Sequence, residues 1–382
     1  MSARGRPDPD WLRARRILAV RLDALGDVLM TAPALRALRE GAPGREVTLL
    51  TSPAGRPAAG LIAAVDQVIV HRAPWVKPGA AAEAGRGVLG LAARLRSGSF
   101  DGAVIFTVYS QSPLPAALLC HLADIPLRLA HCRENPYQLL SHWIRETDPG
   151  PSVRHETRRQ LDLASWAAAP PADEAIALRI PPRAHAAAAA ALAPAGGADR
   201  PLVALHPGAS APSRRYPPER FARMAKLLVR ELGCRVVFTG SRAERPLVEG
   251  IRRAMGAPSS SAAGRLTVAG TAALLAQAAA VVTNNTSASH IAAGVGTPVV
   301  VLYALTNPQH QPWMVPSVVL SHDVPCRNCY RSVCPEGHND CLAKVPPEAA
   351  VEGVRTLFAA RSGTAAPRRA QAPLVAGRSR AC

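Results

Sequence analysis

Several polar segments that could bind phosphate each follow an apolar run of the sequence. They are residues 23–27, 206–215, 239–241 and 284–290, and they supply carboxylate, guanidinium, hydroxyl, amide and imidazole groups. Each leads into a stretch whose apolar residues have helical spacing. The free N–H groups and the dipole at the start of a helix favour phosphate. The pattern therefore indicates a ligand that carries phosphate, such as a nucleotide.

The common nucleotide fingerprints are missing from this sequence. No Gly-x-Gly-x-x-Gly follows the first apolar run, and no Gly-x-x-x-x-Gly-Lys-Ser/Thr occurs anywhere in the chain. These motifs carry the phosphate loops of nicotinamide dehydrogenases and P-loop NTPases. The sequence thus argues against both classes, and a bound nucleotide must be held in another way.

Four of the eight cysteines are clustered near the end of the chain, at Cys326, Cys329, Cys334 and Cys341. In an intracellular chain such a cluster suggests a metal before it suggests disulfides. Four thiolates can hold a structural zinc ion, an iron–sulfur cluster is the second metal hypothesis, and free thiols are the alternative to both. The spacing is not that of a standard pair of zinc knuckles.

The elements that must position these segments alternate between strand and helix. In the first half, strands are expected at 17–22, 46–50, 67–70 and 103–107, with helices at 28–40, 58–63 and 87–96. In the second half, strands are expected at 202–206, 234–239, 266–268, 281–283 and 299–303, with helices at 218–232, 243–255, 271–279, 287–294 and 347–360. This alternation predicts an α/β fold with parallel sheets covered by helices on both faces.

Proline pairs and an alanine-rich stretch up to residue 197 interrupt this alternation, so we expect two domains. The predicted boundaries are 16–174 for the N-terminal domain and 175–361 for the C-terminal domain. The last helix is expected to cross back and pack on the N-terminal domain. The Arg-rich ends, residues 1–15 and 362–382, are expected to be disordered tails.

Composition limits the classes of function. About half of the 382 residues are apolar (48%), yet no apolar run reaches the roughly 18 residues that span a bilayer, and the start lacks a secretory signal. We therefore expect a cytoplasmic protein. The formal charge of +18 comes almost entirely from scattered arginines, which favours the codon bias of a GC-rich genome over nucleic-acid binding. Such a charge would also attract the chain to the anionic inner membrane surface.

The same segments resemble glycosyltransferase family 9, the ADP-heptose:lipopolysaccharide heptosyltransferases. The opening of the family is matched by ILAVRLDALGDVLMTAPALRALRE. The later motifs are matched, in order, by VALHPGASAPSRRYPPERFARMAKLL, VVFTGSRAER and VVTNNTSASHIAAGVGTPVVVLYALTNPQHQPW. The resemblance covers residues 17–358 and is specific because four motifs occur in the family's order.

The resemblance implies a GT-B fold, in which two Rossmann-like domains face each other across a cleft. The N-terminal domain would take a glycolipid or oligosaccharide acceptor, such as the lipopolysaccharide core, and the C-terminal domain a nucleotide-diphosphate sugar, ADP-heptose. The implied activity is transfer of a heptose in one inverting displacement. The alternatives are a GT-B sugar-nucleotide epimerase, a family 9 transferase with another donor, and a degenerate glycolipid-binding protein without activity.

The resemblance also assigns catalytic roles to individual residues. Asp27 matches the family's general base, although an Asp before a helix could also be an N-cap. Gly26 beside it would allow close approach of the backbone. Arg214, with Ser213 and Arg215, stands where the family has a lysine that stabilises the leaving diphosphate; Arg and Lys are not equivalent at such a site. Solvated loop arginines are the alternative.

The remaining implied contacts are to the nucleotide sugar. Glu244 would reach the ribose beyond the Thr239 and Gly240 turn, or would only complement a helix dipole. Asn285 replaces an Asp of the family, so this loop cannot balance a divalent metal, and no cofactor is expected for catalysis. The diphosphate-binding side of the same loop is expected to consist of Thr286, Ser287, Ser289 and His290, with His290 equally suited to packing.

Overall fold

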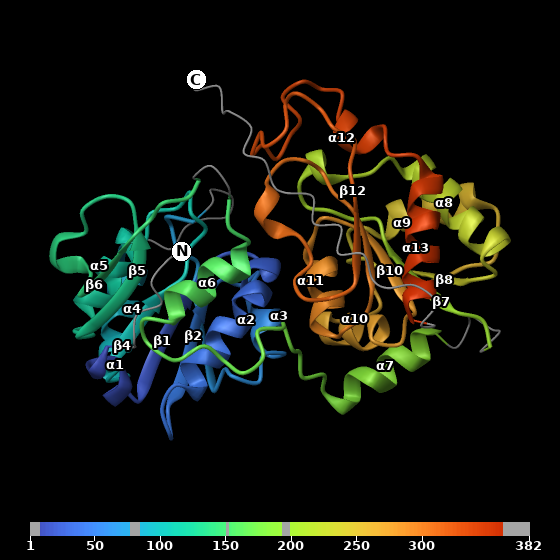
Figure 1. Ribbon diagram of the computed structural model, residues 1–382. Helices are drawn as coiled ribbons and strands as arrows, with labels where there is room; N and C mark the ends of the chain where they lie inside the picture. Colours follow the sequence, from blue (N-terminus) through green and yellow to red (C-terminus); the bar gives the residue numbers. More distant parts are fainter. Residues whose placement is uncertain (1–7, 77–84, 150–152, 193–198, 362–382) are drawn as a thin grey trace. The chain divides into compact units, whose positions relative to one another are not determined.

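The computed structural model describes residues 8–76, 85–149, 153–192 and 199–361. It divides into two compact units, Met1–Arg179 and Ile180–Cys382, and each unit contains one six-stranded sheet (Figure 1). The division falls close to the expected boundary after residue 174. The α/β class with two Rossmann-like domains is confirmed.

The first unit has a parallel sheet in the order β3-β2-β1-β4-β5-β6. Its strands are β1 (Arg16–Arg21), β2 (Glu46–Thr51), β3 (Gln67–Val70), β4 (Gly102–Ile105), β5 (Leu127–Cys132) and β6 (His142–Arg145). Its helices are α1 (Pro9–Arg13), α2 (Leu25–Glu40), α3 (Arg56–Ala59), α4 (Gly85–Ser97), α5 (Leu114–Leu122) and α6 (Glu156–Ala164), with the short turn η1 (Tyr137–Leu139). This is the doubly wound strand order, in which ligands bind beyond the carboxyl ends where the order reverses, here between β1 and β4.

The second unit repeats this topology in the order β12-β11-β10-β7-β8-β9. Its strands are β7 (Leu202–His206), β8 (Arg235–Phe238), β9 (Ser260–Ser261), β10 (Ala280–Asn284), β11 (Val299–Leu302) and β12 (Ser317–Leu320). Its helices are α7 (Pro182–Leu192), α8 (Pro218–Glu231), α9 (Arg245–Met255), α10 (Val268–Leu275), α11 (Ser287–Gly294), α12 (Asp340–Ala343) and α13 (Pro347–Arg361), with turns η3 (Pro212–Arg214) and η4 (Pro308–His310). The order reverses between β7 and β10.

The middle residues of the central strands are apolar because helices cover both faces of each sheet, and polar residues such as Arg21 and Asn284 stand at their carboxyl ends. The residues from Ile17 to Val20 in β1 are at most 1% exposed, and those from Val299 to Leu302 in β11 are fully buried. Complete burial of one such large side chain contributes about 1.5–3 kcal/mol. None of the helices in the described part of the chain has the length and apolar character needed to cross a membrane.

Residues 8–15 are folded, so the predicted disordered tail over residues 1–15 is wrong for this part. Asp8 caps α1 by accepting a hydrogen bond from the backbone N of Asp10 at 2.9 Å. Trp11 is fully buried against Gly102, where an added Cβ would lie 2.6 Å from the indole ring. The arginine-rich composition gave no indication of this contact. Burial of one indole contributes more to the stability of the fold than several solvated arginines do. Residues 1–7 and the predicted tail 362–382 lie outside the described residues.

The expected strand at 266–268 is not formed. Thr267 is instead the N-cap of α10, and its side-chain oxygen accepts a hydrogen bond from the backbone N of Gly270 at 3.2 Å. The edge position of that sheet is taken by the short strand β9. An apolar run too short to show a period fits a strand or a helix start equally well.

The last helix also differs from expectation. Instead of returning to the N-terminal domain, α13 packs on α8 and on strands β10, β11 and β12 of its own unit. Gly353 faces the sheet, where an added Cβ would lie 3.2 Å from Val300 and Val318. Helix α13 therefore completes the core of the second unit.

Candidate functional site

Asp27 lies in the first turn of α2, directly beyond the carboxyl end of β1. One carboxylate oxygen accepts a hydrogen bond from the backbone N of Ala24 at 3.2 Å, and Ala24 is the N-cap of this helix. The other oxygen lies 3.4 Å from Arg21, and 20% of the side chain is exposed. The helix begins at Leu25, so the expected loop 23–27 is shorter than predicted. Asp27 is thus not the N-cap residue, although its carboxylate does support the cap.

A fully buried guanidinium holds this carboxylate in place. Arg21 lies 3.0 Å from Asp23, 3.0 Å from Glu156 and 3.4 Å from Asp27. Burial lowers the pKa of Arg21, but Asp23, then Glu156 and Asp27, raise it above its ordinary value, so the group stays charged. Of the three carboxylates, Asp27 has the most exposed side chain.

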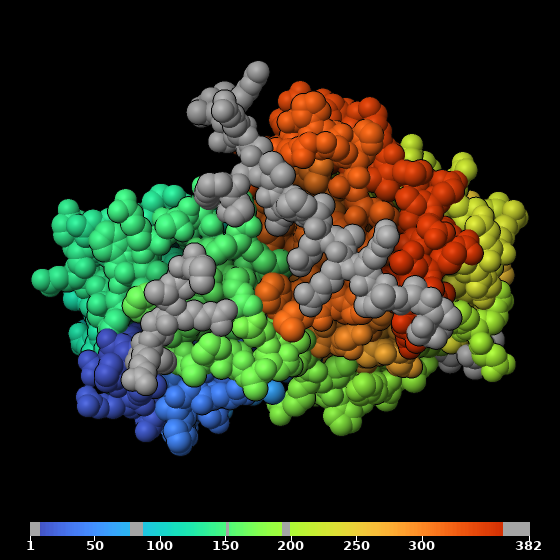
Figure 2. All heavy atoms as spheres, viewed as in Figure 1, coloured from blue at the N-terminus to red at the C-terminus, as the bar shows by residue number. Residues whose placement is uncertain are grey.

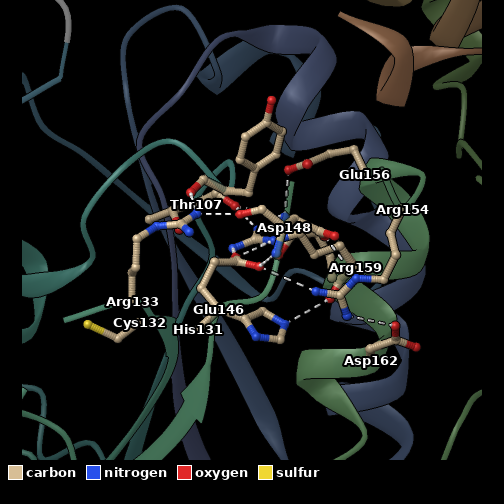
Figure 3. A network of polar contacts seen from close by, with 12 residues as sticks. Thr107, His131, Cys132, Arg133, Glu146, Asp148, Arg154, Glu156, Arg159 and Asp162 are labelled. Atoms are coloured by element: carbon tan, nitrogen blue, oxygen red, sulfur yellow. Dashed lines mark hydrogen bonds and ion pairs between the residues drawn. The ribbon is translucent and has the colours of Figure 1, made fainter. Parts of the chain in front are cut away.

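Helix α6 supplies the buried polar groups beneath this edge of the sheet (Figure 3). Gln160 donates to Glu156 at 2.6 Å and to the backbone oxygen of Thr107 at 3.0 Å. Arg159 donates to Glu146 at 2.8 Å and also to the oxygen of Thr107. The chain just beyond β4 is therefore fixed to the same helix that holds Arg21.

The rest of this network joins the ends of β5 and β6 to α6 (Figure 3). Arg154 lies 2.8 Å from Asp148 and 3.2 Å from Asp162. Burial, together with the adjacent Arg159, lowers the pKa of His131 to about 3, so its ring is neutral at ordinary pH. These partly buried contacts fix the ends of β5 and β6 against α6.

In the second unit, the polar segments meet at the carboxyl ends of β7, β8 and β10. Asn284 donates to the backbone oxygen of Pro207 at 2.8 Å, and its own side-chain oxygen accepts from the backbone N of Tyr216 at 3.2 Å. His206 lies within hydrogen-bond distance of Thr239, 3.0 Å between Nδ1 and Oγ1. Burial lowers the pKa of His206, against the opposing effect of Glu244. Asn284 therefore holds the Arg214 loop against the switch point of this sheet.

Arg214 reaches from this loop to the segment that follows β11. Its Nη2 donates to the side-chain oxygen of Asn307 at 3.0 Å, and Thr306 donates to the same oxygen at 2.8 Å. The Nε of Arg214 is buried and has no hydrogen-bond partner among the described residues. A buried N–H donor of a cation lowers the stability of the fold when it lacks a partner, unless a ligand accepts its hydrogen bond. Arg214 is thus oriented by protein contacts and retains a donor for an anion.

The loop between β12 and α12, which we call the cysteine-rich loop, holds the residues on both sides of Arg214 by hydrogen bonds. Ser213 is buried, donates through its hydroxyl to the backbone oxygen of Arg331 at 2.8 Å, and donates through its backbone N to Ser332 at 3.0 Å. Asn339 donates to the backbone oxygen of Arg215 at 3.3 Å. The side chain of Arg215 itself turns back to a carbonyl of its own loop at 2.8 Å. The contacts of Ser213 therefore hold the loop in place in this structure. Of the two arginines, Arg214 is better placed to bind an anion.

Glu244 connects the loops after β7 and β8. Its carboxylate accepts a hydrogen bond from the backbone N of Ser241 at 2.7 Å. An added Cβ on Gly208 would lie 2.0 Å from the same carboxylate, and one on Gly240 would lie 3.4 Å from it. Only glycine fits at 208 while Glu244 holds this position. A contact between Glu244 and a ribose stays a prediction.

Residues 285–290, which include the first turn of α11, divide into buried and accessible side chains. Asn285 is 3% exposed and accepts a hydrogen bond from the backbone N of Ala304 at 3.2 Å. Ser289 is fully buried and donates to the backbone oxygen of Thr286 at 2.7 Å, and His290 is also buried. Thr286 and Ser287, at the start of α11, are partly exposed. The start of α11 is therefore the accessible part of the predicted diphosphate site.

Cys326, Cys329 and Cys334 lie in the loop between β12 and α12, and Cys341 lies in α12; this part of the second unit is coloured orange to red in Figure 2. Burial raises the pKa of Cys326 and of Cys341, and the neighbouring thiols of the cluster add to both shifts, so the four side chains share one region. All four are partly exposed and free. Within the described residues, no three His, Cys, Asp or Glu side chains are arranged as ligands of one metal ion. A zinc site at these thiols stays a prediction.

Comparison with known proteins decides the family. The model of glycosyltransferase family 9 (heptosyltransferase) matches residues 88–339. The chain belongs to glycosyltransferase family 9. Lipooligosaccharide heptosyltransferase 2 of Haemophilus influenzae is 29% identical over 170 residues, which are 42% of this chain and 48% of that protein. The chain thus matches about half the length of the curated relatives.

Solved structures of the family share the fold over most of the chain. The glycosyl transferase family 9 protein of Veillonella parvula has a TM-score of 0.76 at 21% identity, covering 93% of this chain and 99% of that one. The Escherichia coli ADP-heptose lps heptosyltransferase II has a TM-score of 0.71 at 22% identity, covering 91% and 99%. These matches confirm the GT-B fold class expected from the sequence.

Proposed function

We propose that this protein is an inverting heptosyltransferase. It transfers a heptose from ADP-heptose to a hydroxyl group of a lipopolysaccharide core or a related glycan. Membership of the family supports the reaction class, and the names of its relatives support the donor and the acceptor. The formal charge of +18 supports a location at the anionic inner face of a membrane, where a glycolipid acceptor would be held.

The proposed step is one displacement at the anomeric carbon. Asp27 takes the proton of the acceptor hydroxyl, the hydroxyl oxygen forms the new bond to the anomeric carbon, and the bond to ADP breaks on the opposite face. The departing diphosphate gains negative charge, which Arg214 and the N–H groups at the start of α11 stabilise. The observation that carries the proposal is the unpaired Nε of Arg214 beside Asn307, since it provides a donor for that charge.

Calorimetric titration with ADP-, GDP- and UDP-sugars tests the donor. We expect ADP-heptose to bind most tightly, with the same affinity in the presence and absence of added magnesium, because Asn285 supplies no charge for a metal. Transfer is then measured with a glycan acceptor. Conversion of the nucleotide sugar without an acceptor would identify an epimerase, and binding without conversion would identify a non-catalytic binding protein.

The zinc hypothesis is a separate proposal, and it requires the cysteine-rich loop to rearrange on binding the metal. Protein purified under anaerobic conditions should contain about one zinc per chain if the four thiolates form a single tetrahedral site. The double substitution Cys326→Ser and Cys329→Ser should remove the metal, and Cys382→Ser, outside the cluster, should retain it. Elemental analysis that finds neither zinc nor iron would leave four free thiols.

A further inference from the structure

A hollow of about 800 Å³ lies in the second unit at the amino ends of its strands, at the edge of the sheet opposite Arg214 and the start of α11. Its volume falls within the roughly 300–1,000 Å³ that is usual for sites of small organic ligands. Strand β10 runs between the two edges, and at about 3.3 Å per residue its length separates them by about 13 Å. The hollow is therefore separate from the proposed donor site.

Three prolines contribute to the apolar part of the lining. Pro201, Pro298 and Pro316 each directly precede a strand, β7, β11 and β12 respectively. Proline has no backbone N–H, and the oxygens of these three residues already accept hydrogen bonds from backbone N atoms of neighbouring strands at 2.9, 2.9 and 3.0 Å. The backbone therefore offers little to a polar ligand here, and side chains must bind its polar groups.

Arginine side chains supply the charged part of the lining. The Nε of Arg200 donates to the backbone oxygen of Gly233 at 2.6 Å, and the Nε of Arg235 donates to that of Arg200 at 3.2 Å. Arg361, at the end of α13, donates through Nη1 to the backbone oxygen of Ala279 at 3.2 Å. These acceptors lie just before β8, β7 and β10, which are adjacent strands about 4.8 Å apart. Each guanidinium is thus anchored through one nitrogen beside the same hollow.

Positive charge exceeds negative charge around the hollow. Within the described part of the chain, the lining holds one acidic residue, Asp199, and neither Arg200 nor Arg361 forms an ion pair. The carbonyl groups at the ends of α10 and α11 also lie at this edge, and their partial negative charge opposes an anion. These carbonyls already accept hydrogen bonds, as Leu275 does from the hydroxyl of Thr297 at 2.8 Å. Three guanidinium groups against one carboxylate therefore favour an anion here.

We propose that this hollow is a second anion site, which binds a phosphate ester at the edge of the sheet opposite the proposed donor site. The phosphate accepts charge-assisted hydrogen bonds from the remaining N–H groups of Arg200 and Arg361, and Arg235 adds to the positive charge. The organic part of the ester packs on the apolar lining that the prolines provide. The ester is either a small soluble compound or the head group of an anionic lipid, and the two sources share this chemistry.

Glycerol 3-phosphate and glycerol are matched soluble probes, because they differ only in the phosphate group. Calorimetric titration of the full chain at fixed ionic strength should show that the phosphate binds at least about tenfold more tightly than glycerol. The double substitution Arg200→Ala and Arg361→Ala should lower the affinity for the phosphate at least about tenfold, and the corresponding pair of lysine substitutions should retain part of it. If the alanine pair does not fold, Arg200→Gln alone should lower the affinity severalfold. An affinity that these substitutions leave unchanged would place the phosphate elsewhere, the donor edge included, and would overturn the proposal.

The double substitution Arg94→Ala and Arg253→Ala is the matched control. Both arginines are exposed and lie outside the lining, so this pair removes the same charge without changing the hollow. It should bind glycerol 3-phosphate as the unaltered protein does, and equal losses in the two pairs would reduce the effect to net charge and overturn the proposal. Neither pair should change donor affinity. Absence of transfer from every nucleotide sugar would reject the proposed function alone.

Vesicles distinguish the two sources of the phosphate ester. Sedimentation of the full chain with vesicles of phosphatidylglycerol is compared with its sedimentation with phosphatidylcholine vesicles. Binding to phosphatidylglycerol that the Arg200 and Arg361 alanine pair loses, and the control pair keeps, would identify a lipid head group. Binding of glycerol 3-phosphate without such vesicle binding would identify a soluble ester. If neither the soluble phosphate nor the anionic vesicles bind in a way that depends on these two arginines, the hollow is not an anion site.

Discussion

Replacing Asp27 by asparagine should nearly abolish transfer while the protein stays folded and still binds the nucleotide sugar. Asparagine retains a side-chain oxygen for the cap bond to Ala24 but cannot accept the proton of the acceptor hydroxyl. Loss of a general base typically costs about 10²–10⁴-fold in rate. Because Asp23 and Glu156 still pair with Arg21, the buried guanidinium is not left without a counter-charge. The rate is measured with donor and acceptor at saturation, and donor affinity by calorimetry.

Asp27→Ala separates the catalytic role from the capping role. It removes the cap bond as well as the base, so it should lower the free energy of unfolding by about 1 kcal/mol, whereas Asp27→Asn should change it little. Both variants should be equally inactive. Near-normal transfer by the asparagine variant would restrict Asp27 to helix capping.

Arg214→Ala should weaken binding of the nucleotide sugar about tenfold and slow transfer by about 10²–10³-fold. The larger effect falls on the rate because the charge of the diphosphate grows as the bond to the sugar breaks. Arg214→Lys should recover part of the rate, since it restores the charge without the planar fork. Isothermal titration and single-turnover rates measure the two effects separately.

Arg215→Ala is the matched control, with the same charge removed from the adjacent position. The Arg215 side chain donates to a carbonyl of its own loop, so its loss should change donor affinity and rate by less than about threefold. Equal losses in the two variants would mean that the net charge of the loop, and not the position of Arg214, determines donor binding.

The sequence predicted those strands and helices whose apolar residues follow a clear period. The edge strands β6 and β12 were missed because they are only partly buried: every second residue of β6 is exposed, and β12 is partly exposed throughout. The edge strand β3 was predicted, whereas the internal strand β5 was missed although its last four residues are buried. Helix α6 is rich in charged and polar residues and would pass for a surface segment. It is buried because Glu156, Arg159 and Gln160 find polar partners in distant parts of the chain.

The residues of the candidate site that lie within a local sequence motif could be predicted. Asp27, Arg214 and the start of α11 lie in segments that resemble the family, and each falls at the carboxyl end of a strand. Arg21 and Glu156 could not be paired from the sequence, since they are 135 residues apart and meet only through the tertiary structure. The bond between Arg214 and Asn307 was missed for the same reason.

Because α13 packs on its own sheet, each half of this protein carries a complete hydrophobic core, and one junction between Arg179 and Ile180 separates the two. A core change in one half can then be compensated by repacking within that half. Recombination at this junction would pair the first unit of one family member with the second unit of another without cutting through either core. The fold thus gives evolution two units whose interiors can change separately.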